Sequence, residues 1–101
     1  MIYALTVPAG IEDVEEVRVL EWAKQTGEAF GRGDLLVELE THKALVEIRA
    51  GRPAVLRKIL CGAGSWQAAG KLLAILSDEA SESLPDPTSD LPEFAIDFEV
   101  S

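Results

Sequence analysis

The 101-residue sequence has a single cysteine, Cys61, so it has no internal disulfide, and this is typical of a protein from a reducing compartment. None of its apolar runs approaches the roughly 20 residues that span a membrane, and no basic and apolar leader precedes the first strand-like segment. We therefore expect a cytoplasmic protein of one small domain plus, at most, a tail. We interpret Cys61 as a small core residue.

Basic residues are absent after Leu76, where eight of the 18 acidic residues lie. The part of the chain up to Leu76 has ten acids and all nine bases, so almost all of the net charge of -9 belongs to the C-terminal segment. An acidic segment of this kind argues against binding to nucleic acid or to an anionic membrane surface.

Residues with a recognisable catalytic arrangement are also lacking. The sequence shows no nucleophile triad, no paired carboxylates at catalytic spacing and no phosphate-binding glycine motif. His42 is the only histidine, and a lone histidine without other ligands at suitable spacing is weak evidence for a metal or a catalytic base. We predict no catalytic site and no metal site.

Short runs of strand-forming residues are separated by glycine and proline throughout residues 2–76. This spacing predicts an all-β sandwich or barrel. A helix over residues 12–24 is the main alternative, and we prefer a loop over residues 12–16. Residues 62–70 are expected to form a loop. The predicted strands cover residues 2–7, 17–23, 35–40, 44–49, 55–61 and 72–76.

Residues 35–49 follow a period of two that is interrupted once, which indicates two half-buried strands. In this pattern Leu36 belongs to the outer face together with Glu38 and Glu40. The inward apolar sets of the two strands are Leu35, Val37 and Leu39, and Ala44, Val46 and Ile48.

A tight turn centred on His42 and Lys43 would join these strands so that Leu39 faces Val46 and both apolar sets share one face. A slip of one residue would expose one set, so the pattern specifies the register. Lys43 is then at the tip of a hairpin and points to solvent.

The same register predicts two neighbouring pairs on the outer face. Glu40 lies opposite Leu45 beside the tip, and an exposed leucine there is either incidental or a docking point for a partner. Glu38 lies opposite Glu47, a like-charge pair that keeps this face hydrated.

An internal repeat supports the β interpretation. A shift of 37 positions superposes Gly27 on Gly64 and Gly33 on Gly70. The heptapeptides GDLLVEL at 33–39 and GKLLAIL at 70–76 then coincide. Two similar halves that pack their apolar faces together predict a sandwich with pseudo-two-fold symmetry.

Residues 40–44, Glu-Thr-His-Lys-Ala, resemble the modification hairpin of the biotinyl/lipoyl-attachment domain family. The resemblance covers roughly residues 2–76 and includes Trp22 and both glycine pairs. Lipoyl domains usually read Glu-Thr-Asp-Lys-Ala at the tip, so His42 stands where aspartate is usual. Biotin carriers usually have methionine on both sides of the lysine, where this chain has His42 and Ala44, so the lipoyl form is favoured.

This resemblance implies a flattened sandwich of two four-stranded antiparallel sheets, with lipoate joined to Lys43 by an amide bond. The chain would be a non-catalytic swinging-arm carrier of acyl groups, aminomethyl groups or electrons. The residues implied in recognition around the tip are Glu40, Thr41, His42, Ala44 and Leu45.

The implied partners are a lipoate ligase or lipoyl transferase, and the dehydrogenase, acyltransferase and dihydrolipoamide dehydrogenase components of a lipoate-dependent complex. We expect the domain itself to be monomeric. Two alternatives remain open at this point. One is a biotin carrier domain of a carboxylase, with biotin as the cofactor, and the other is an unmodified β-sandwich that acts as an adaptor.

Composition divides the chain into a carrier domain at 1–76, an acidic linker rich in proline and serine at 77–93, and a C-terminal segment at 94–101. In the last segment large apolar residues alternate with other residues, which predicts a strand over 94–100 that pairs with the domain's own sheet edge or with a partner. The alternating residues are Phe94, Ile96, Phe98 and Val100.

Overall fold

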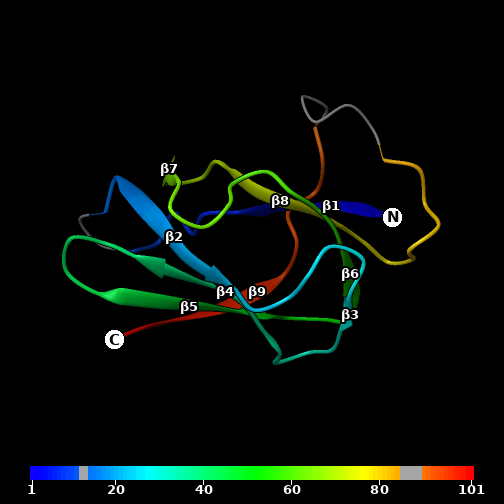
Figure 1. Cartoon of the computed structure of the whole chain (residues 1–101), viewed down its shortest axis with the longest axis horizontal. Coiled ribbons are helices and arrows are strands. Elements are labelled where there is room, and N and C mark those ends of the chain that lie inside the picture. Colours follow the sequence, from blue (N-terminus) through cyan, green and yellow to red (C-terminus); the bar gives the residue numbers. More distant parts are fainter. Residues whose placement is uncertain (12–13, 85–89) are drawn as a thin grey trace.

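The computed structural model describes residues 1–11, 14–84 and 90–101, and within these residues it has nine strands and no helix (Figure 1). The strands in chain order are β1 (Ile2–Thr6), β2 (Glu16–Trp22), β3 (Ala29–Phe30), β4 (Leu35–Glu40), β5 (Leu45–Ala50), β6 (Ala54–Ile59), β7 (Trp66–Ala68), β8 (Leu72–Ser77) and β9 (Ile96–Val100).

Two antiparallel sheets form the molecule. One has the strand order β1-β8-β6-β3 and the other β7-β2-β4-β5-β9. The inward residues of both sheets pack into one apolar core, which is the arrangement of a β-sandwich. Fully buried members of the core come from both sheets and include Leu5, Val19, Leu39, Ile48, Leu56 and Leu73.

The all-β prediction is confirmed, with one more strand in the second sheet than the two four-stranded sheets expected. The helix considered for residues 12–24 is wrong over its described part, because Glu16–Trp22 forms β2 and pairs with β4 and β7. Residues 12 and 13 lie outside the described residues. The loop expected at 62–70 contains the short strand β7, which is too brief to leave a period in the sequence.

The inward and outward faces of β4 differ from the sequence pattern at one position. Leu36 was expected on the outer face, but it is buried, whereas Leu35 is only half-buried. The cause is a register shift between Leu35 and Val37 in the pairing with β5. A bulge of this kind turns two consecutive side chains toward the same side, so both Leu36 and Val37 reach the core.

The repeat found in the sequence is a repeat of structure. Exchanging β1, β8, β6 and β3 with β5, β4, β2 and β7 converts one sheet order into the other, and only β9 has no counterpart. The four glycines of the repeat all have positive φ, with 91° at both Gly27 and Gly64. Glycine adopts this conformation without the steric cost that other residues meet.

Hydrogen bonds repeat between the halves as well. The Gly27 amide donates to the Leu56 carbonyl oxygen at 2.6 Å, and the Gly64 amide donates to the Val19 carbonyl oxygen at 2.7 Å. The Thr41 amide donates to the Ala44 carbonyl oxygen at 2.8 Å. Its counterpart is the Asp78 amide, which donates to the Met1 carbonyl oxygen at 3.0 Å.

The C-terminal segment runs along both sheets. The Ala4 amide donates to the Pro92 carbonyl oxygen at 2.9 Å, and the Phe94 amide donates back to the Ala4 carbonyl oxygen at 2.8 Å, so this part follows the edge of β1. β9 then pairs antiparallel with β5 along its whole length. The segment thus joins the β1 edge of one sheet to the β5 edge of the other.

Phe94 anchors this segment in the core between its contact with β1 and its pairing with β5. Its side chain is 5% exposed, and its ring lies edge-on to Tyr3 and Phe30 at centroid distances of 5.4 and 5.9 Å. Such aromatic pairs stabilise beyond the area that they bury. Of the four alternating residues, Phe94 is therefore a core residue that precedes the strand, and the strand itself begins at Ile96.

Candidate functional site

The candidate site is the tip of the hairpin formed by β4 and β5. Leu39 pairs with Val46 and Val37 with Ile48, which confirms the register that the sequence pattern predicts. The turn between these strands consists of Thr41, His42, Lys43 and Ala44. Figure 1 shows this tip at the same end of the molecule as the C-terminus and at the opposite end from the N-terminus.

Thr41 organises the turn. Its hydroxyl oxygen accepts hydrogen bonds from the Lys43 amide at 3.1 Å and from the Ala44 amide at 2.9 Å. The same hydroxyl donates to the Ala44 carbonyl oxygen at 3.2 Å, alongside the backbone bond between these two residues. Thr41 is buried, whereas His42 and Lys43 are exposed. The local bonding therefore shapes the backbone that presents Lys43.

The outer-face pairs predicted beside the tip are present. Glu40 pairs with Leu45, whose side chain is 44% exposed. The Arg18 guanidinium on β2 lies 4.0 Å from the Glu40 carboxylate, a contact that the sequence pattern did not reveal. The C-terminus lies here too, because the Leu45 and Ser101 amides each donate to the other residue's carbonyl oxygen, at 3.0 and 2.9 Å.

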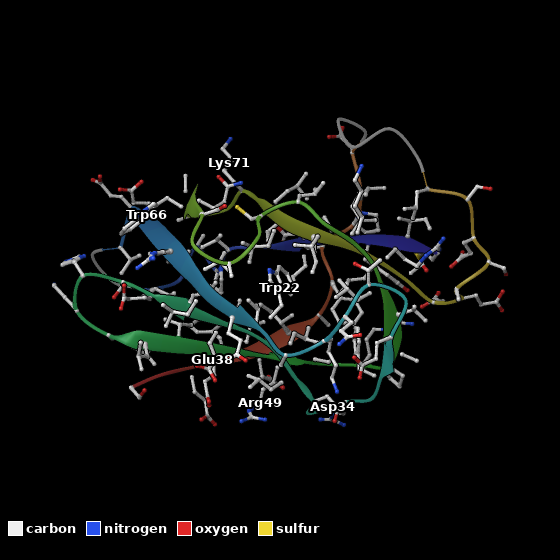
Figure 2. The ribbon with its side chains drawn as sticks, viewed as in Figure 1. Trp22, Asp34, Glu38, Arg49, Trp66 and Lys71 are labelled. Atoms are coloured by element: carbon white, nitrogen blue, oxygen red, sulfur yellow. The ribbon has the colours of Figure 1, made fainter. Side chains whose placement is uncertain are left out.

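Glu38 and Glu47 form the predicted like-charge pair further down the hairpin. Arg49 offsets their repulsion, because its guanidinium lies 3.4 Å from the Glu47 carboxylate. The other guanidinium nitrogen donates to the Gly33 carbonyl oxygen at 3.2 Å, which holds the side chain along the strand. Figure 2 shows Arg49 and Asp34 on one side of the ribbon and Trp66 and Lys71 on the opposite side.

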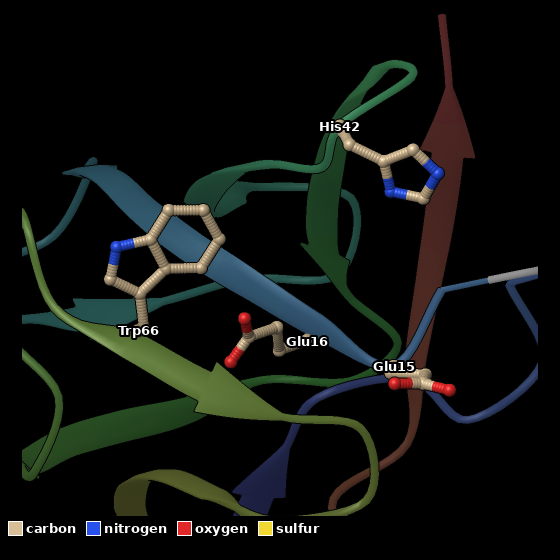
Figure 3. A pocket seen from close by; sticks show the side chains of 4 residues that line it. All are labelled: Glu15, Glu16, His42 and Trp66. Carbon is tan, nitrogen blue, oxygen red and sulfur yellow. The ribbon is translucent and has the colours of Figure 1, made fainter.

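His42 lines a cleft that sequence reasoning did not find. The cleft has a volume of about 310 Å³, and its other walls are Glu15, Glu16 and Trp66 (Figure 3). Trp66 comes from β7, which pairs with β2 and so brings this side chain, 56% exposed, to the same end of the sheet as the tip. These four residues come together only because strands that are distant in the sequence pair, so the cleft could not be predicted from a local sequence pattern.

The described residues give no other chemical centre at the tip. Within residues 1–11, 14–84 and 90–101, no group of three or more His, Cys, Asp or Glu side chains is placed where it could hold a metal ion. Cys61 is buried, and its backbone carbonyl oxygen accepts a hydrogen bond from the Trp22 indole at 2.8 Å. What the site presents is an exposed lysine on a hairpin whose turn is hydrogen-bonded through Thr41.

The family model described as "Biotin-requiring enzyme", which covers biotin and lipoyl attachment, matches residues 4–76. The chain belongs to the biotin/lipoyl attachment family. The match includes both halves of the repeat and has the candidate lysine near its centre.

Within the matched region, curated relatives are about one third identical to the chain. It is 35% identical over 85 residues to the dihydrolipoyllysine-residue succinyltransferase component of the 2-oxoglutarate dehydrogenase complex of Bacillus subtilis, covering 83% of this chain and 20% of that protein. It is 35% identical over 79 residues to the mitochondrial dihydrolipoyllysine-residue acetyltransferase component of the pyruvate dehydrogenase complex of Caenorhabditis elegans, covering 77% and 16%. The chain spans about a fifth of the length of the curated relatives that it matches.

The fold of the chain also matches that of a solved lipoyl domain. The solution structure of the lipoyl domain of the 2-oxoglutarate dehydrogenase complex from Azotobacter vinelandii matches with a TM-score of 0.64 and 31% sequence identity. The match covers 95% of that domain and 74% of this chain. The chain is therefore an attachment domain related to the lipoyl domains of 2-oxo acid dehydrogenase complexes.

No helix among the described residues has the length and apolar character needed to cross a membrane.

Proposed function

We propose that this chain is a non-catalytic lipoyl carrier domain in which Lys43 receives the lipoyl group. The observation that carries the proposal is the exposed position of Lys43 at the tip of a hairpin whose backbone Thr41 ties together. The surrounding Glu-Thr-His-Lys-Ala segment and the relation to lipoyl domains support lipoate over biotin.

The chain's own residues suit this role. An attaching enzyme must reach a primary amine, and Lys43 is an exposed residue of the turn at the end of the sandwich. A bound lipoyl group supplies a disulfide ring that accepts acyl groups as thioesters or carries electrons as a dithiol. The domain supplies position and recognition, in which Glu40, His42 and Leu45 are the exposed or half-exposed side chains around the tip.

We further propose that this arm works between the enzymes of a lipoate-dependent complex. A lipoate ligase or lipoyl transferase would modify it, and dehydrogenase, acyltransferase and dihydrolipoamide dehydrogenase components would use it. The names of the relatives, which are components of 2-oxoglutarate and pyruvate dehydrogenase complexes, support this class of partner. Identification of the proteins that co-purify with the modified chain would show which complex it serves.

The test is modification of the purified chain by a lipoate ligase with lipoate, followed by intact mass and peptide mapping. We expect one adduct, at Lys43. Lys43→Arg should abolish it without lowering the melting temperature, because an exposed tip side chain contributes little to stability. Lys71→Arg, which changes another exposed lysine, is the matched control and should label like the wild type.

Three other results decide against the proposal. An adduct that survives in Lys43→Arg, or that maps to Lys24, Lys58 or Lys71, would place the site elsewhere. A biotin adduct formed by a biotin ligase in place of the lipoyl adduct would make the chain a biotin carrier. An absence of any adduct with both ligases would favour the unmodified adaptor.

A further inference from the structure

A groove with a volume of about 300 Å³ opens beside the hairpin tip. It is distinct from the cleft lined by His42, and it lies between the tip, the described residues Gly10, Ile11 and Val14, and β9. Its principal lining residues are Ile11, Val14, Lys43, Ala44, Phe98 and Val100. The volume is at the lower end of the roughly 300–1,000 Å³ that small-molecule sites occupy.

β9 makes this groove because it extends one sheet beyond the other. Val100 pairs with Val46 and Phe98 with Ile48, and residues directly opposite each other in an antiparallel pair share a face. Val46 and Ile48 are fully buried, but Phe98 and Val100 are 38% and 51% exposed. Among the residues that the structure describes, the facing sheet has four strands and none that covers Phe98 and Val100, so these two side chains form an apolar shelf beside the core.

Phe98 also forms contact with the opposite wall. A Cβ atom at Gly10 would lie 3.9 Å from the tip of the Phe98 ring, so the ring lies close to Gly10. Ile11 and Val14 beyond it are half-buried and pack against the core. The groove therefore has apolar walls on both sides and an ionisable side chain, Lys43, at its mouth.

We propose that this groove is a resting site for the lipoyl group attached to Lys43 of the same chain. This inference rests on the proposed function. It adds that the lipoyl arm exchanges between a docked position in the groove and a free position in solvent. The lipoyl group is an eight-carbon acyl chain that ends in a disulfide ring, and its transfer from water to an apolar wall is favourable.

One feature of the chain singles out this occupant. The residue that would bear the group lines the groove, so docking is intramolecular and meets no cost of bringing two molecules together. The acyl chain that lipoylation adds to Lys43 is apolar, like the side chains of Ile11, Val14, Phe98 and Val100 that line the groove.

Docking of this kind has a chemical consequence for the disulfide ring. When the arm rests in the groove the ring is shielded, and a partner enzyme must capture it from the free fraction or draw it out. The apparent reactivity of a group is reduced to the fraction of time that it is accessible. An arm docked two thirds of the time reacts roughly threefold more slowly than a free arm.

The first measurement compares amide chemical shifts of the full chain before and after lipoylation. We expect changes around the tip and, in addition, at Ile11, Val14, Phe98 and Val100, independent of protein concentration. Changes confined to residues 41–45 would overturn the proposal. Changes in the groove that grow with concentration would also overturn it, because they would identify a second copy as the occupant.

The second measurement is the rate at which iodoacetamide alkylates the reduced lipoyl thiols. Phe98→Ala with Val100→Ala should raise this rate roughly threefold, because the shelf is lost. The matched control is Asp97→Ala with Glu99→Ala, which makes the same number of alanine changes on the opposite face of β9 and should leave the rate at the wild-type value. Equal rates in all three proteins would contradict docking.

Two safeguards keep the outcome interpretable. If the double variant loses β9, which amide hydrogen exchange reports, the shifts in the wild-type chain decide the question. If no ligase modifies the chain, the proposed function fails, and N-ε-octanoyl-lysine placed at position 43 by an expanded genetic code still tests the groove. Absence of groove shifts in that protein would overturn the resting site by itself.

Discussion

Gly51 and Ala95 are packed backbone to backbone. The Gly51 amide donates to the Ala95 carbonyl oxygen at 2.9 Å, and a Cβ atom at Gly51 would lie 2.7 Å from that same oxygen. A Cβ carbon does not approach a carbonyl oxygen so closely, so the C-terminal segment can follow its path only past a glycine. This contact comes immediately before β9, the strand that pairs with β5.

Gly51→Ala should therefore release β9. We expect the amides of residues 96–100 to exchange with solvent close to random-coil rates, while the core amides of β4 and β8 remain protected. Gly62→Ala is the matched control, because a Cβ atom there meets nothing within 4 Å. If both variants retain protected amides in β9, the close approach at Gly51 does not hold the segment.

Thr41→Val should loosen the hairpin tip and slow lipoylation while Lys43 is still present. The change keeps the shape of the side chain but removes the oxygen that accepts hydrogen bonds from the Lys43 and Ala44 amides. Donors left without a partner cost about 1–3 kcal/mol in the free energy of unfolding. The initial rate with a lipoate ligase and a chemical denaturation curve measure the two effects, and Thr41→Ser should preserve both.

His42→Asp should raise the lipoylation rate with a general lipoate ligase. The expected reason is that aspartate is the usual residue at this place in the lipoyl domains that the tip resembles. Glu15 and Glu16 share the cleft with position 42, so His42→Asn is needed to separate the effect of shape from that of a third carboxylate. A lower rate for His42→Asp alone would show that the acidic cleft opposes this change.

Asp78 should contribute stability that disappears in acid. It accepts a hydrogen bond from Tyr3 at 3.0 Å and pairs with Arg52 at 3.1 Å and with the N-terminal ammonium group. Partial desolvation favours a higher pKa for Asp78, but the Tyr3 hydroxyl and the N-terminal ammonium group outweigh it, and the pKa lies below the ordinary value of 3.8. A lowered pKa stabilises the fold above 3.8, and this contribution is lost as the pH falls through the folded-state value.

The difference in melting temperature between the wild type and Asp78→Asn measures this contribution. We expect a small positive difference at about pH 6, since exposed ion pairs are weak, and this difference should shrink as the pH falls below 3.8. The matched control is Glu79→Gln, a neutralising change at the next position that leaves the Tyr3 and Arg52 contacts of Asp78 in place. A difference that stays constant over this range would contradict the assignment to Asp78 ionisation.

The hairpin could be predicted from the sequence because its information is local. Alternation over residues 35–49 specifies the register of β4 and β5, and a one-residue slip would expose Val46 or Leu39. The repeat of glycines likewise predicted the symmetry, since Gly27 and Gly64 adopt the same positive φ. The proposed role of Lys43 follows from the resemblance at the tip and stays a prediction until an adduct is mapped.

The remaining features depend on residues that are far apart in the chain. The bulge at Leu35–Val37 depends on how β5 fits against β4, and nothing in the residues of β4 alone announces it. The cleft around His42 needs β7 to pair with β2, and the groove needs β9 to pair with β5. The alternation in the C-terminal segment predicted a strand, but its partner and the burial of Phe94 depend on packing against both sheets.

The matching hydrogen bonds at Thr41 and Asp78 have a topological consequence. In one half of the molecule the two residues of the lysine-bearing tip join Thr41 to Ala44, and in the other the corresponding neighbours, Asp78 and Met1, have no short connection between them. The hairpin tip and the gap between Asp78 and Met1 thus occupy equivalent positions in the two halves of the repeat. A circular permutant could begin after the tip, run to Asp78 and continue through a two-residue loop into Met1. This protein should keep every pairing among β1 to β8. The new loop between Asp78 and Met1 would then occupy the place in its half of the molecule that the lysine-bearing tip occupies in the other half.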